Sequence, residues 1–123
     1  MARRTDAPGL THLRVTFSDD FYMGPGRADL LEGIAATGSI SAAGKAMGMS
    51  YKRAWGLVQA MNLGWQSPLV EASRGGAAQG GASLTPDGAF VLERYRAMEA
   101  ATREAIAGDV SVVGKRLDMA RGK

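Results

Sequence analysis

The sequence predicts one mostly α-helical domain that carries a small β hairpin, and three observations lead to this prediction. The 123 residues have the usual size of a single domain, and 46% of them are hydrophobic, which is enough to form a core. Apolar residues recur at helical spacing along much of the chain. Two short strand-like segments, residues 69–72 and 82–85, flank the glycine-rich stretch SRGGAAQGG, as in a β hairpin.

The sequence of residues 1–38 predicts an N-terminal arm, a strand and a helix. Residues 1–10 are interpreted as a flexible arm. Residues 13–17 alternate apolar and polar side chains, so we expect a short half-buried strand there. After the break Gly24-Pro25-Gly26, helical spacing predicts a helix over residues 27–37 with Gly38 as its stop.

The segment SISAAGKAMGMSYKRAWGLVQAMN predicts two helices joined by a tight turn. Ser39 or Ser41 can cap a short helix that stops at Gly48, and Ser50 can cap a second helix from Tyr51 to about residue 63. Alanines in the middle of the short helix allow the two helices to cross closely. Two helices joined by a short turn with glycine form a helix-turn-helix.

Thr85-Pro86-Asp87 marks the start of a last helix, which helical spacing extends to Gly108. Residues 108–123 are interpreted as a frayed tail. The predicted order β-α-α-α-β-β-α is that of a winged helix-turn-helix domain, here over residues 11–107. Because the last helix (about 86–107) is longer than so small a core needs, we expect it to form a C2 homodimer through the stripe of Val91, Tyr95, Met98, Thr102 and Ile106.

Composition narrows the function. The net charge is +3, and residues 38–86 carry all of it, with four basic residues against one acidic, which favours a polyanionic partner. With no cysteine and a single histidine, His12, we expect no metal, no cofactor and no catalytic site, and therefore no enzyme. No apolar run reaches the ~18–20 residues of a membrane span, and no signal peptide is found, so a cytoplasmic location is expected.

The helix from Tyr51 to residue 63 has two faces. Ala54, Leu57, Val58 and Met61 should pack inward, whereas Lys52, Trp55, Gly56 and Gln59 point outward. In winged helices the outward face enters the major groove, where lysine and glutamine can contact base edges. Arg53 is more lateral and suits a phosphate.

Other residues of the candidate surface leave alternatives open. Tyr51 is either a partly buried prop or a DNA contact; Trp55 either packs beneath the hairpin or meets sugar and thymine methyl groups. The glycine-rich stretch lacks the Lys-Ser/Thr of a P-loop and is interpreted as a wing that lets the backbone approach DNA. The predicted DNA contacts are Ser39, Ser50, Tyr51, Lys52, Arg53, Trp55, Gln59, Arg74, Gly75 and Gly76.

The runs SISAAGKAMGMSYKRAW, LVEASRGG and GGASLTPDG resemble the DNA-binding half of the molybdate-responsive, ModE-type transcriptional regulators, which is distantly similar to LysR-type winged helices. The resemblance covers about residues 13–104. It implies a homodimer that binds an inverted-repeat operator in double-stranded DNA and regulates molybdate uptake.

The further domains that form the oxyanion pocket in that family have no counterpart in this sequence. Molybdate binding by this chain alone is therefore not expected. The alternatives are a winged helix that binds another protein and an oxyanion-responsive regulator that acts with a partner.

Overall fold

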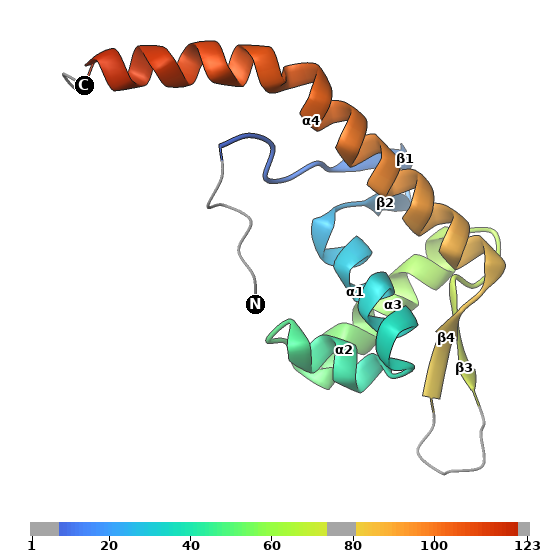
Figure 1. The fold of residues 1–123 in the computed structure, drawn as a ribbon. Coiled ribbons are helices and arrows are strands. Elements are labelled where there is room, and N and C mark those ends of the chain that lie inside the picture. Colours follow the sequence, from blue (N-terminus) through green and yellow to red (C-terminus); the bar gives the residue numbers. More distant parts are fainter. Residues whose placement is uncertain (1–7, 74–80, 121–123) are drawn as a thin grey trace.

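The computed structural model describes residues 8–73 and 81–120 (Figure 1). Its elements, in order, are β1 (Val15–Ser18), β2 (Phe21–Met23), α1 (Pro25–Thr37), α2 (Ile40–Ala46), α3 (Tyr51–Gly64), β3 (Val70–Ser73), β4 (Gly81–Leu84) and α4 (Pro86–Ala120). β1 pairs with β2 and β3 with β4, both antiparallel. The helices α2 and α3 followed by the hairpin β3–β4 give the predicted mostly α-helical winged-helix fold. Most of the predicted arm, residues 1–7, lies outside the described residues.

β2 was missed by the sequence analysis. It pairs with β1 through Val15 opposite Met23 and Thr16 opposite Tyr22, with an irregularity before Ser18. Three residues are too few to show an alternating pattern, which explains why the sequence did not predict this strand. Phe21 and Met23 nevertheless point into the core.

The core lies between α1, α3, the two hairpins and the first half of α4. α1 is its central element and contributes Leu30, Leu31 and Ile34, all fully buried. Small residues let the helices approach as predicted. A Cβ added to Gly33 would lie 2.9 Å from the Cβ of Ala43, and one added to Gly44 would lie 2.7 Å from the Cβ of Ala54.

A serine side chain caps the N-terminus of each helix of the helix-turn-helix. The Oγ of Ser39 accepts a hydrogen bond from the backbone N–H of Ala42 at 3.0 Å, so Ser39 rather than Ser41 caps α2. The Oγ of Ser50 accepts from the N–H of Arg53 at 3.1 Å and caps α3. Gly48, in the turn between the helices, has a φ of +77°, a conformation that favours glycine.

α4 continues past Gly108 to Ala120, so the expected frayed tail is wrong for residues 108–120. The valines of this segment suggested no clear helix, yet a glycine inside a helix costs only about 1 kcal/mol and does not end it. In Figure 1 the second half of α4, orange to red, extends beyond the winged-helix core. Along residues 103–118 it shares a groove with residues 8–10.

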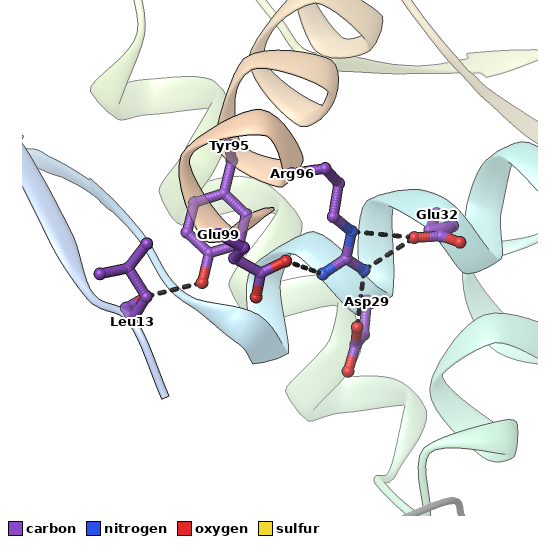
Figure 2. A network of polar contacts seen from close by, with 6 residues as sticks. All are labelled: Leu13, Asp29, Glu32, Tyr95, Arg96 and Glu99. Atoms are coloured by element: carbon purple, nitrogen blue, oxygen red, sulfur yellow. Dashed lines mark hydrogen bonds and ion pairs between the residues drawn. The ribbon is translucent and has the colours of Figure 1, made fainter. Parts of the chain in front are cut away.

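The first half of α4 is held on α1 by a polar network (Figure 2). The guanidinium of Arg96 lies 2.8 Å from Asp29, 2.7 Å from Glu32 and 2.9 Å from Glu99. The hydroxyl of Tyr95 donates a hydrogen bond to the carbonyl oxygen of Leu13 at 2.6 Å. Asp29 and Glu32 of α1 are thus partners of α4.

The packing of α4 on the core buries one part of the predicted dimer stripe and leaves the other part exposed. Val91 and Tyr95 are buried in the core of their own chain, so they cannot contact a second copy, and this part of the prediction is corrected. Met98, Thr102 and Ile106 remain partly exposed.

Candidate nucleic-acid interface

The helix α3 has the two faces that its sequence predicts. Ala54, Val58 and Met61 are buried, and Leu57 is half-buried. The outward side chains are exposed: those of Tyr51, Lys52, Arg53, Trp55 and Gln59. At 3.6 residues per turn, Trp55 lies about 40° around the helix from Tyr51, and Gln59 about 40° further. Lys52 falls next to Gln59 in this arc, so the four side chains form one continuous surface.

Tyr51 and Trp55 stack on each other on this surface. Their ring centroids are 6.4 Å apart and the ring planes are inclined by 10°. Tyr51 is 56% exposed and Trp55 is 40% exposed. Tyr51 is therefore not a buried prop, and its ring is available to a partner.

The two rings line a groove of about 580 Å³ between the helix-turn-helix and the wing. The other lining residues are Ser39, Ile40 and Ser41 at the start of α2 and Ala72, Gly81 and Ala82 of the hairpin. The N–H of Ala82 donates to the carbonyl oxygen of Gly38 at 2.9 Å, which ties β4 to the start of α2. Trp55 thus borders a groove shared with the wing.

Asn62 positions β3 relative to α3, a role that the sequence analysis missed. Its Oδ1 accepts from the N–H groups of Leu69 at 2.8 Å and Val70 at 3.1 Å, and its Nδ2 donates to the carbonyl oxygen of Val70. One amide side chain therefore satisfies three backbone groups where the chain turns into the wing. The sequence signal for this role was that Asn62 is a polar residue next to the buried positions of the predicted helix.

Asp87 adds a second tie. Its Oδ2 accepts from the indole Nε1 of Trp65 at 2.9 Å and from the hydroxyl of Ser67 at 2.8 Å. These two hydrogen bonds stabilise the carboxylate and hold the pKa of Asp87 below its ordinary value of 3.8. The end of α3 and the start of α4 are joined at this point.

The charges of α2, α3 and β3 favour an anionic partner. Lys45, Lys52 and Arg53 are exposed on α2 and α3, and Glu71 on β3 is the one acidic residue in residues 38–73. The predicted contacts Arg74, Gly75 and Gly76 lie outside the described residues. In residues 8–73 and 81–120, no three His, Asp or Glu side chains gather as metal ligands. No helix in this described part is long and apolar enough to cross a membrane.

The fold and the outward face of α3 define the class: a winged-helix domain with a basic and aromatic surface on the second helix of its helix-turn-helix. The chain is 53% identical over 78 residues to the molybdenum-pterin-binding protein MopB of Rhodobacter capsulatus, covering 63% of this chain and 29% of MopB. It is 37% identical over 99 residues to MopA of the same organism, covering 78% of this chain and 37% of MopA.

The DNA-binding transcriptional dual regulator ModE of Escherichia coli K12 is 39% identical over 83 residues, which cover 68% of this chain and 32% of ModE. The homologues are therefore ModE regulators and Mop molybdenum-pterin-binding proteins, and the resemblance seen in the sequence is confirmed. The chain spans about a third of the length of these relatives. No family model matches the chain. The names of these relatives describe regulators and binding proteins rather than enzymes.

Proposed function

We propose that this chain is the DNA-binding part of a transcriptional regulator, a winged helix that binds double-stranded DNA of defined sequence as a homodimer at an inverted repeat. The observation that carries this proposal is the outward face of α3, where Lys52 and Gln59 are exposed while the opposite face is held in the core. The similarity to ModE of Escherichia coli K12, which is named as a DNA-binding transcriptional regulator, supports it.

The proposal gives each predicted residue a role. Lys52 and Gln59 contact base edges in the major groove, and Arg53 contacts a phosphate from the side of α3. Ser39 and Ser50 accept helix N–H groups, and their O–H groups remain able to donate to phosphate oxygens. In the wing, Arg74, Gly75 and Gly76 approach the DNA backbone or the minor groove.

The test compares two mutants on two DNAs, the tightest-binding duplex selected from a random library and a scrambled duplex. Lys52→Ala should weaken binding to the selected duplex by about 1–3 kcal/mol and to the scrambled duplex by little, because a base contact is lost. Arg74→Ala should weaken both about equally and lower the salt slope by about one, because a phosphate contact is lost.

The control for this test is Arg94→Ala, which removes one exposed positive charge from α4 and leaves α3 intact. It should leave the affinity for both duplexes close to that of the wild type. If Lys52→Ala and Arg74→Ala behave alike, the division between helix and wing is wrong.

A protein-binding module is the second candidate, and an apolar groove favours it. This groove of about 340 Å³ lies between the β1–β2 hairpin and the start of α4 and includes the exposed Phe17 and Phe90. If neither Lys52→Ala nor Arg74→Ala weakens DNA binding, this second function replaces the first.

We also propose that these 123 residues do not bind molybdate by themselves. An oxyanion site needs cationic groups that converge and are free to donate, and two candidate arginines are already engaged. Arg96 is surrounded by three carboxylates, and Arg27 stacks on Tyr22 and donates to its carbonyl oxygen. A micromolar calorimetric isotherm with molybdate, with a matching rise in melting temperature, would overturn this.

A further inference from the structure

The stacked pair Tyr51–Trp55 leaves two large aromatic rings facing solvent on one side of a groove. Large apolar side chains that gather on a surface mark a place where a partner binds. We propose that this pair contacts the C5-methyl group of a thymine in the major groove and so selects A·T base pairs beside the wing. The inference rests on the proposed function, in which α3 enters DNA.

The surroundings of the rings favour DNA as the partner. Besides the two rings, the described residues that line the groove are serines, alanines, a glycine and one isoleucine, and none of these described residues is acidic. Lys52 follows Tyr51 directly on α3, and Arg53 lies further around the same helix. A small apolar surface next to cationic side chains complements a methyl group carried by a polyanion.

The chemistry of the duplex identifies the methyl group as the target. Bases inside a duplex are stacked on each other, so their faces are closed to a protein and their edges alone are offered in the grooves. In the major groove, thymine presents its C5-methyl group, and an apolar side chain can contact it. The aromatic pair borders the groove that α3 shares with the wing, so this thymine should lie on the wing side of the bases that Lys52 and Gln59 contact.

The geometry also makes such a contact efficient. Residues four apart on a helix are neighbours, and the near-parallel packing of these two rings restricts the rotation of both. Rings that are already held in place lose little conformational entropy when a partner binds. Most of the gain from covering the methyl group is therefore retained as affinity.

The experiment removes the methyl group without changing base pairing. The probe is the tightest-binding duplex selected by the wild-type chain from a random library, with each thymine replaced in turn by deoxyuridine. Replacement at one or two positions of a half-site should weaken wild-type binding about fourfold, the value for one buried methyl group. Trp55→Ala should bind more weakly and lose its sensitivity to those positions.

Two further variants separate the contact from general damage. Lys52→Ala should keep the uracil sensitivity, because it changes a neighbouring contact and leaves the rings in place. Phe90→Ala removes an exposed aromatic ring from α4 and should behave as the wild type. Trp55→Phe retains a ring and should keep part of the sensitivity, which guards against a fold defect in Trp55→Ala.

Each outcome has a consequence. If wild-type binding is insensitive to uracil at every position, or if Trp55→Ala is as sensitive as the wild type, the inference is wrong while the proposed function stands. If the wild-type chain binds no duplex more tightly than a scrambled one, the proposed function fails and the inference fails with it.

Discussion

At the scale of single residues, Asp87 makes a pH-dependent tie between α3 and α4. Hydrogen bonds from Trp65 and Ser67 lower its pKa below 3.8, so the folded state favours the carboxylate more than the unfolded state does. The stability that Asp87 adds is therefore present above about pH 4 and is lost as the pH falls through its lowered pKa. Asp87→Asn should lower the melting temperature at pH 7, and the difference from the wild type should shrink below pH 4. Thermal unfolding from pH 7 to 2.5 checks this; a constant difference would contradict it.

Tyr95 gives a second prediction at this scale. Burial, and then the nearby carboxylate of Glu99, raise the pKa of its phenol to about 12. The stability that Tyr95 contributes is present below pH 10 and is lost as the pH rises towards 12. Tyr95→Phe removes the hydrogen bond to Leu13 and should cost about 1 kcal/mol in urea unfolding at pH 7. An ultraviolet titration should lose its component near pH 12 in this variant.

Residue roles could be predicted from the sequence where they follow from periodicity. The two faces of α3 are an example, because the spacing of Ala54, Val58 and Met61 alone determines which side is buried. The roles of Asp87 and Arg96 could not be predicted, because their partners lie about 20 and more than 60 residues away in the chain. Such pairs exist only after the elements have packed.

At the scale of elements, Arg96 holds α4 on α1. Glu99 is 7% exposed, and without Arg96 its carboxylate would be left buried without its partner. Arg96→Met should therefore destabilise the fold by about 2–4 kcal/mol. Glu32→Gln removes an exposed partner and should cost less than about 1 kcal/mol. Urea unfolding of both variants measures the contrast, and equal losses would show that the buried carboxylate is not the dominant cause.

Two helical glycines should respond in opposite ways to alanine. Gly56 on α3 has open space around an added Cβ, so Gly56→Ala should stabilise the fold by about 0.5–1 kcal/mol. Gly88 in the first turn of α4 packs against the carbonyl oxygen of Leu69, and an added Cβ would collide with that backbone. Gly88→Ala should therefore destabilise by at least about 1 kcal/mol. Melting temperatures that move in the same direction would contradict this.

Elements with a clear stop or start signal were predicted well, and those without one were not. α2 and α3 match because their serine caps and Gly48 limit them. β2 is too short to carry a pattern, and the extension of α4 contains Val110, Val112 and Val113, whose strand preference concealed a helix. In both places the local sequence was ambiguous.

At the scale of the whole molecule, the second half of α4 projects beyond the core (Figure 1). It carries the exposed apolar side chains of Val112, Val113 and Leu117. At 3.6 residues per turn, the outer part of the predicted dimer stripe (Met98, Thr102 and Ile106) lies on the same side of α4 as Val113 and Leu117, within an arc of about 100° around the helix axis. The exposed Asp109 and Arg116 lie within the same arc. The stripe thus continues beyond Val91 and Tyr95, which are buried in their own chain. We expect the homodimer to form through this outer part of the stripe.

Val113 is the residue on which this assembly can be tested, because its side chain is 68% exposed in the single chain and a substitution should not disturb the core. The wild type should be a dimer at tens of micromolar by light scattering, since two α3 helices must lie about 34 Å apart to reach successive major grooves. Val113→Lys would bury a charge between the helices and should weaken the dimer at least about tenfold. It should also reduce the affinity for an inverted repeat towards the affinity for one half-site.

The control is Glu104→Lys, which lies on the opposite side of α4 and adds positive charge without touching the stripe. This variant should remain a dimer. A monomeric wild type, or a dimer that Val113→Lys leaves intact, would place the assembly surface elsewhere.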